Sequence, residues 1–232
     1  MRFEETQPVD PKQIDEYLTC HPETTHVSVV HCETTTGVLN PLADIAAVVK
    51  KHGKTLIVDA MSSFGGVPVD MAALGIDFMI SSANKCIQGV PGFGFIIARR
   101  SLLEGCKALP ARCRSTCMTS GRRWRADTAS GASLLPLTWC ALHAGTEGTE
   151  GRRRCGGTPC TLRENHRTLV EGMRSLGYKT LLPDEEQSPV ITSFYYPSAD
   201  FNFKDFYTKL KAKGFVIYPG KISQADTFRI AT

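Results

Sequence analysis

Apolar residues recur with two different periods in this 232-residue chain, and the two periods alternate along its first hundred residues. Short apolar runs are typical of buried strands, whereas apolar residues three or four positions apart are typical of helices. Strands are therefore predicted over residues 26–32, 55–58, 77–80 and 93–98, and helices over residues 11–18, 42–53 and 70–74. Strand and helix in alternation predict an α/β fold with a mainly parallel sheet and right-handed crossovers.

The strand over residues 93–98 is expected to run against its neighbour. A short connection rich in Gly and Pro separates it from the strand over residues 77–80. This connection is too short for a crossover helix, so an antiparallel arrangement is predicted.

From residue 162 onward the elements are shorter and differently ordered. Helices are predicted over residues 164–176 and 202–213, and strands over residues 190–196, 215–218 and 228–231. This order favours a small α+β domain at the carboxyl end of the chain.

Polar segments follow three of the predicted parallel strands, at residues 31–37, 59–63 and 81–85. Ligands of parallel sheets bind beyond the carboxyl ends of the strands. We therefore expect these three segments to form one site.

Two residues of this site, Lys85 and Asp59, suit a pyridoxal cofactor. A lysine amine can form a Schiff base with the aldehyde, and a carboxylate can pair with the pyridinium nitrogen. A solvated surface lysine and a helix-capping aspartate are the alternative interpretations of the same residues.

Three ordered segments carry a resemblance to a known family. They are residues 30–41 (VHCETTTGVLNP), 58–66 (VDAMSSFGG) and 81–92 (SSANKCIQGVPG). In sequence and spacing they resemble the class V aminotransferases of fold type I, over about residues 6–107 and 163–231. Within that family they resemble most the branch that transfers the amino group of 2-aminoethylphosphonate to pyruvate. The branch that uses alanine and glyoxylate stays open as the alternative.

The resemblance implies a fold, a cofactor and a set of site residues. The fold would be a large domain with a mainly parallel sheet plus a small α+β domain, and the cofactor pyridoxal 5'-phosphate. The working form would be a homodimer. By resemblance, Lys85 and Asp59 are catalytic and bind the cofactor. Cofactor contacts are also implied for Thr34, Met61 and Asn84, and a substrate carboxylate contact for Arg229.

The resemblance also suggests that both domains are incomplete. Residues 1–110 would form a partial cofactor-binding domain, residues 162–232 a partial small domain, and residues 111–161 an atypical segment between them. A non-catalytic fragment is therefore an alternative to a working enzyme.

The segment between the two domains differs in composition from the rest of the chain. Residues 111–160 lack Val, Ile, Phe, Tyr, Lys, Asn and Gln and hold eight arginines against three acidic residues. This segment thus has a charge of +5, compared with a net charge of +4 for the whole chain. A shifted reading frame, entered near Leu109 and left near Leu162, is our hypothesis for this composition. Two alternatives are a nucleic-acid-binding segment and a zinc site built from Cys113, Cys117, His143, Cys155 and Cys160.

Composition excludes several other classes of protein. No apolar run approaches the length of a membrane span, and the first residues do not resemble a secretory signal. An odd total of nine cysteines argues against a disulfide framework. We expect a cytoplasmic protein with small-molecule substrates and without a metal, a nucleic-acid partner or a membrane.

Overall fold

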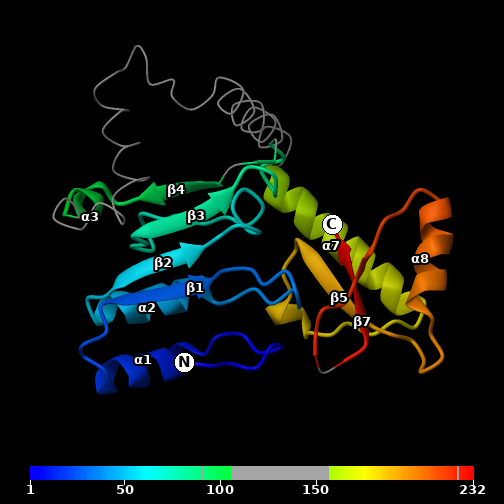
Figure 1. Cartoon of the computed structure of the whole chain (residues 1–232), viewed down its shortest axis with the longest axis horizontal. Coiled ribbons are helices and arrows are strands. Elements are labelled where there is room, and N and C mark those ends of the chain that lie inside the picture. The colour runs from blue at the N-terminus through cyan, green and yellow to red at the C-terminus, as the bar shows by residue number, and fades with distance from the viewer. Residues whose placement is uncertain (90, 93, 106–156, 224) are drawn as a thin grey trace, which may run out of the picture.

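Two sheets and the helices that cover them make up the computed structural model of the chain (Figure 1). The structure describes residues 1–89, 91–92, 94–105, 157–223 and 225–232. The frameshift, nucleic-acid and zinc hypotheses fall on a segment that lies outside these residues, except for the start of one helix at 157–161.

The first sheet has four strands in the order β1 (His26–Val30), β2 (Thr55–Asp59), β3 (Phe78–Ser82) and β4 (Gly94–Ala98). The first three are parallel and β4 is antiparallel to β3, so the predicted arrangement is confirmed. The strand predicted over residues 77–80 ends two residues later than expected, because Ser81 and Ser82 pair with β4.

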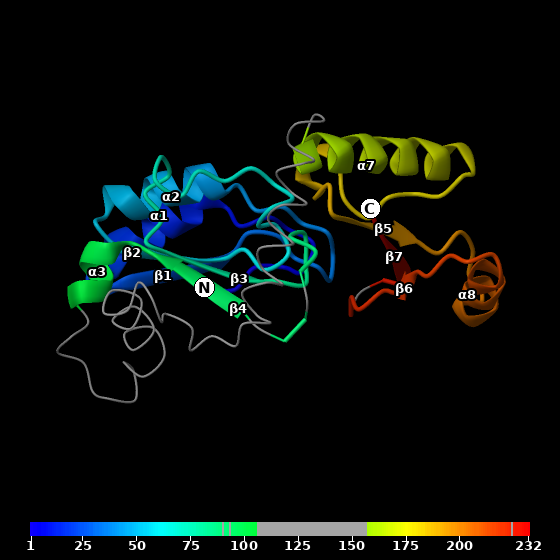
Figure 2. The same cartoon turned by 90° about the horizontal axis from the view of Figure 1, so that it is seen from above.

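Two helices, α1 (Pro11–Cys20) and α2 (Leu42–Lys51), cover one face of this sheet (Figure 2). The side chain of Asp10 accepts a hydrogen bond from the Lys12 amide and so caps α1. The apolar faces of the helices and sheet pack into one core. Its most buried members include Leu18, Ile45, Val49, Leu56, Val58 and Met79.

The helix predicted over residues 70–74 is wrong. The segment forms a turn, in which the Asp70 carboxylate accepts hydrogen bonds from the amides of Ala72 and Ala73. The Leu74 amide donates to the Asp70 carbonyl, and the backbone then turns away at Gly75. A single capped turn satisfies these groups without continuing into a helix. The helix α3 (Arg100–Gly105) follows β4 at the end of the first sheet (Figure 1).

The second sheet is antiparallel, in the order β5 (Ile191–Tyr195), β7 (Thr227–Ala231) and β6 (Tyr218–Pro219). The strand predicted over residues 215–218 is mostly wrong, because Phe215 and Val216 are 63% and 60% exposed and lie outside the sheet. α7 (Gly157–Ser175) and α8 (Phe203–Ala212) accompany this sheet (Figures 1 and 2).

The two faces of the second sheet carry different kinds of side chain. One face buries Phe194 and Phe228, which pair across the strands with ring centroids 5.7 Å apart and join an aromatic core with residues of α7 and α8. Side chains alternate along a strand, so the opposite face carries Tyr218 and Arg229, which are also paired. Arg229 therefore lies on the face turned away from this core.

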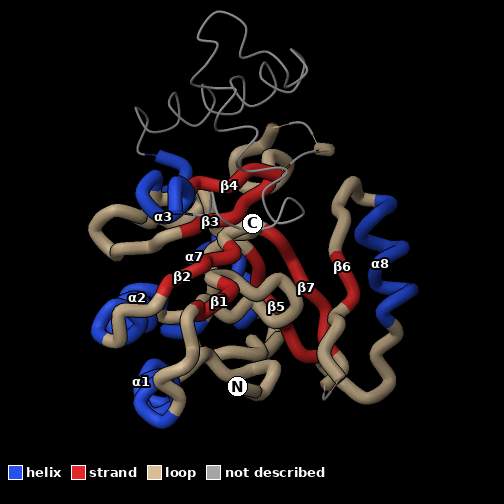
Figure 3. Tube along the Cα trace, turned by 60° about the vertical axis from the view of Figure 1, so that its left-hand side comes forward, coloured by secondary structure: helices blue, strands red, loops and turns tan. Residues whose placement is uncertain are grey.

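The loop over residues 31–40 joins the two sheets. Its backbone forms hydrogen bonds with the segment before β5: Leu39 N donates to Glu186 O, and Ser188 N donates to Gly37 O at 2.8 Å. Gly37 has a φ of +92°, and a Cβ there would lie 2.7 Å from the Ile191 carbonyl oxygen. We call residues 31–40 and 186–191 together the seam; Figure 3 shows the two sheets that the seam joins, with their strands in red.

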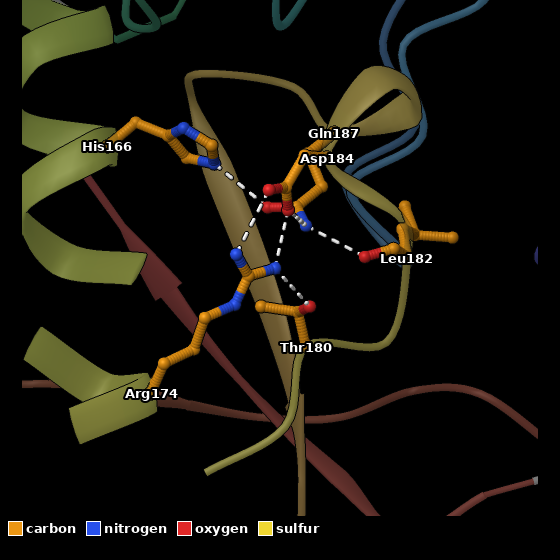
Figure 4. A network of polar contacts seen from close by, with 6 residues as sticks. All are labelled: His166, Arg174, Thr180, Leu182, Asp184 and Gln187. Carbon is orange, nitrogen blue, oxygen red and sulfur yellow. Dashed lines mark hydrogen bonds and ion pairs between the residues drawn. The ribbon is translucent and has the colours of Figure 1, made fainter. Parts of the chain in front are cut away.

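A polar network supports the seam from the side of α7 (Figure 4). The Arg174 guanidinium binds both carboxylate oxygens of Asp184, which lies in the short 3-10 helix η2 (Asp184–Glu186). The buried Gln187 amide donates to the carbonyl of Leu182 at 2.8 Å, and its oxygen lies 3.1 Å from His166 Nε2. The exposed ion pair adds little stability, whereas the Gln187 contacts fix the backbone against which Val38 and Leu39 pair.

Replacing Gly37 by alanine is expected to open the seam. Gly37→Ala adds a left-handed backbone strain of about 1 kcal/mol and a clash with a backbone oxygen that cannot rotate away. We expect a loss of roughly 2–4 kcal/mol in the free energy of unfolding, measured by urea denaturation. Gly177→Ala is the matched control, since Gly177 has a φ of +87° with nothing within 4 Å of its Cβ position. Equal losses in both variants would contradict a tight seam at Gly37.

Candidate functional site

The carboxyl ends of β1, β2 and β3 lie at one edge of the first sheet, as the sequence predicts. Asp59 ends β2 and is in register with Val30 of β1 and Ile80 of β3. The chain continues in register beyond the strands, because His31 N donates to Asp59 O and Ala60 N donates to Ile80 O, both at 2.9 Å. The three polar segments predicted to form one site therefore start side by side.

Asp59 keeps part of its carboxylate available. Its Oδ1 accepts a hydrogen bond from the Met61 amide at 2.9 Å, and its Oδ2 accepts none from the residues that the structure describes. Partial burial, together with the charge of Asp59, raises the pKa of Glu33. Met61 contacts Asp59 through its backbone, and its side chain is 41% exposed.

Lys85 lies in a tight turn just after β3. The turn is closed by hydrogen bonds of 2.7 Å from Gln88 N to Lys85 O and from Gly89 N to Ala83 O. Gln88 adopts a φ of +61°, a conformation that residues other than glycine rarely take. The turn thus holds the exposed Lys85 at the mouth of the site, whereas Ala83 is fully buried.

A pocket of about 820 Å³ lies between the two sheets. Four of the six predicted site residues line it: Thr34, Asn84, Lys85 and Arg229. Asp59 and Met61 are outside its lining, although the next residue, Ser62, belongs to it. A pocket of this size suits a small molecule or a cofactor with its substrate.

Arg229 is 8% exposed and is held by one backbone carbonyl of β6 and one of the loop after β1. Its Nε donates to the Pro219 carbonyl at 3.1 Å, and its Nη1 donates to the Thr34 carbonyl across the seam. Burial lowers the pKa of this guanidinium. Its Nη2 donates no hydrogen bond to a residue that the structure describes, so one edge of the planar group is available to a ligand.

His31 is a buried residue of the site to which the sequence alone assigned no role. It is 4% exposed, and its Nδ1 forms a hydrogen bond of 2.9 Å with Oγ of the fully buried Ser63. Burial lowers the pKa of His31 to about 4. The imidazole is therefore neutral near pH 7, and its contact fixes the start of the loop after β1 against the loop after β2.

Other lining residues were also missed by the sequence analysis. Asn165 reaches the pocket from α7, and Tyr218 and Lys221 reach it from the turn around β6. No pattern around Asn165 distinguishes it from a solvated helix residue. Lys221 follows a Tyr-Pro-Gly turn, which indicates a turn but no ligand.

Comparison with known proteins identifies the family. A family model described as aminotransferase class-V matches residues 1–126, which is more than half of the chain. This chain belongs to the class V aminotransferase family. Its α/β architecture, with a mixed sheet and covering helices, is that of fold type I.

Curated relatives of this class V aminotransferase carry one recurring name. A 2-aminoethylphosphonate–pyruvate transaminase of Phocaeicola vulgatus is 58% identical, over 99% of this chain and 64% of that protein. One of Aeromonas hydrophila is 51% identical, over 97% of this chain and 60% of that protein. The chain thus spans less than two thirds of the length of these relatives.

Solved structures agree on the fold of this class V aminotransferase. Ureidoglycine–glyoxylate aminotransferase from Bacillus subtilis matches with a TM-score of 0.88 at 20% identity, over the whole of this chain and 60% of that one. Pyridoxamine–pyruvate aminotransferase from Mesorhizobium loti matches with a TM-score of 0.84 at 25% identity and the same coverage. Among the described residues, no helix has both the length and the apolar character needed to cross a membrane.

The neutral state of His31 predicts a pH-dependent stability. An unfolded histidine takes up a proton near pH 6.5, whereas His31 in the folded chain does so near pH 4. As the pH falls between these values the unfolded state binds more protons, so the free energy of unfolding decreases, by roughly 3 kcal/mol for His31.

Urea denaturation at several pH values between about 7 and 4 tests this. In His31→Gln the decrease is expected to be smaller by that amount, because the titrating group is gone. His26→Gln, at an exposed position on β1, controls for the loss of a histidine. An unchanged pH slope in His31→Gln would contradict a buried neutral imidazole.

Proposed function

We propose that this class V aminotransferase uses pyridoxal 5'-phosphate to transfer the amino group of 2-aminoethylphosphonate to pyruvate, giving phosphonoacetaldehyde and alanine. The names of the relatives at 50–58% identity support these substrates. The observation that carries the proposal is that Lys85, after β3 of the first sheet, and Arg229, in β7 of the second sheet, line one pocket. A nucleophilic amine and an anion-binding guanidinium are thereby presented to the same ligand.

The residues present fit this cofactor. An amine at the end of β3 and a carboxylate at the end of the neighbouring β2 supply the two groups that a pyridoxal ring needs. The Asp59 Oδ2 accepts no hydrogen bond from the described residues and is available to the ring nitrogen. Ser82, three positions before Lys85, has a buried Oγ that also lacks a hydrogen-bond partner among the described residues. Lys85 would hold the aldehyde covalently and Asp59 would accept the ring N–H, with Thr34, Asn84 and the Met61 backbone as further contacts.

When bound, pyridoxal phosphate supplies an aldehyde that takes up an amino group and a ring that accepts the electron pair released at the substrate carbon. Asp59 would keep the ring nitrogen protonated through a charge-assisted hydrogen bond. Lys85, once its amine is released, would move a proton to or from the substrate carbon as general base and acid.

Arg229 would orient the acidic end of each substrate. Its guanidinium cannot rotate freely, because two of its nitrogens already donate to the Pro219 and Thr34 carbonyls. Such an ordered group loses little freedom when a ligand binds, and its planar edge matches a carboxylate or phosphonate. The same residue would therefore serve both half-reactions.

We further propose, from the family alone, that the working form is a homodimer, which sedimentation can test.

The proposal is tested first by trapping the cofactor. Borohydride reduction of the purified chain with pyridoxal phosphate, followed by peptide mass mapping, is expected to place the reduced adduct on Lys85. Lys85→Arg should carry no adduct there and should lose at least about 10³-fold of the alanine formed from 2-aminoethylphosphonate and pyruvate, because the residue that moves the proton is lost.

Two outcomes would contradict the proposal. Labelling scattered over exposed lysines, equal in the parent chain and Lys85→Arg, would mean that no cofactor site exists. A specific adduct on Lys85 with turnover of alanine and glyoxylate but not of 2-aminoethylphosphonate would assign the chain to the other branch of the family.

A further inference from the structure

The pocket between the sheets has an unbalanced charge. Three cationic side chains line it, each from a different element: Lys85 from the turn after β3, Lys221 from the turn after β6, and Arg229 from β7. No aspartate or glutamate is among the lining residues that the structure describes. Like charges gathered around one partly enclosed space repel one another, so the pocket favours a ligand that brings more than one negative charge.

Two of these cations have roles in the proposed reaction, and Lys221 has none. Lys85 would be used for the cofactor, and Arg229 presents one planar edge, which a singly charged carboxylate satisfies. Lys221 is exposed at the pocket and makes no hydrogen bond or ion pair with the residues that the structure describes. It is a compact positive charge available to the same ligand as Arg229.

The backbone holds Lys221 close to β7. Gly220 N donates to Thr227 O at 2.8 Å, and a Cβ on Gly220 would lie 2.5 Å from that oxygen, so this turn packs directly on the strand that carries Arg229. On the other side of Lys221, the amide and hydroxyl of Ser223 donate to the Glu5 carboxylate at 3.1 and 3.0 Å. The turn that carries Lys221 is therefore tethered on both sides of this residue, at Gly220 and at Ser223.

We propose that Lys221 is a specificity-determining residue that recognises the second negative charge of a phosphonate group. This inference rests on the proposed function and deepens it. A phosphonate, like a phosphate, carries up to two negative charges near neutral pH. Arg229 alone serves a monoanionic carboxylate such as that of pyruvate, and Arg229 with Lys221 serves the dianionic phosphonate. One pocket thus accepts two substrates of different charge.

The test compares two probes that have the same tetrahedral shape, lack an amine and differ in charge. Ethylphosphonate is mostly a dianion at about pH 9, whereas ethanesulfonate is a monoanion at the same pH. Their binding to the chain in the presence of pyridoxal phosphate is measured by calorimetry. Lys221→Met is expected to weaken ethylphosphonate about 10- to 100-fold and ethanesulfonate no more than about twofold. At about pH 5.5, where the phosphonate is mostly monoanionic, the effect on ethylphosphonate should shrink toward that on ethanesulfonate.

Two control variants define the effect. Lys209→Met removes an exposed lysine of α8 outside the pocket and should change neither affinity. Lys221→Arg keeps the positive charge and should restore most of the affinity for ethylphosphonate. The affinity for pyridoxal phosphate, followed by absorbance, should be the same in Lys221→Met as in the parent chain.

Several results would overturn the inference. Equally weakened binding of both probes to Lys221→Met would indicate a structural role for the lysine. Unchanged binding of both probes would mean that Lys221 does not make the proposed contact. The same conclusion would follow if ethylphosphonate did not bind the parent chain. A loss of pyridoxal phosphate affinity in Lys221→Met would assign the lysine to the cofactor phosphate. Failure of the proposed function is recognised separately, because it would appear as absent alanine formation and absent labelling of Lys85.

Discussion

The close approach of two backbones at the seam is the constraint on which the site depends. Gly37 brings its main chain against the Ile191 carbonyl, and no side chain fits between them. The hydrogen bonds from Leu39 N to Glu186 O and from Ser188 N to Gly37 O then fix the loop after β1 against the segment before β5. Because these are main-chain contacts, they set the distance between the sheets directly and leave little freedom for adjustment.

The chemistry of the pocket follows from this geometry. Thr34 lies in the same loop as Gly37, and its carbonyl accepts a hydrogen bond from Arg229, which belongs to the other sheet. A buried guanidinium needs such acceptors, since an unpaired buried charge is strongly destabilising. The seam therefore stabilises Arg229 and also directs it toward the space that Lys85 enters from β3. The polar network around Gln187 contributes indirectly, because it fixes residues 186–191, with which the loop over residues 31–40 forms hydrogen bonds.

The sequence predicts the parts of this molecule that depend on local pattern. The parallel order of β1 to β3, the antiparallel β4 and the meeting of three polar segments at one edge are confirmed, because periodicity and connection lengths determine them. Two predicted elements were wrong. The segment after Asp70 was predicted as a helix, but the Asp70 side chain caps a single turn. Phe215 and Val216 were predicted in a strand because they are apolar, but both are exposed outside the sheet. The position of Lys221 at the pocket and the buried neutral His31 depend on contacts between distant segments, which no pattern in one sequence reveals.

Disulfide trapping across the seam tests this account most directly. Cys32 Sγ donates a hydrogen bond of 3.1 Å to Ser188 Oγ, and both side chains are buried, so the two positions face one another across the seam. In Ser188→Cys, mild oxidation at about pH 8.5 is predicted to form a disulfide between the introduced cysteine and Cys32, which peptide mass mapping detects. When the variant is unfolded in urea before oxidation, the preference for this pair should be lost. Coupling of the introduced thiol to other cysteines in preference to Cys32 would contradict the seam and the pocket built on it.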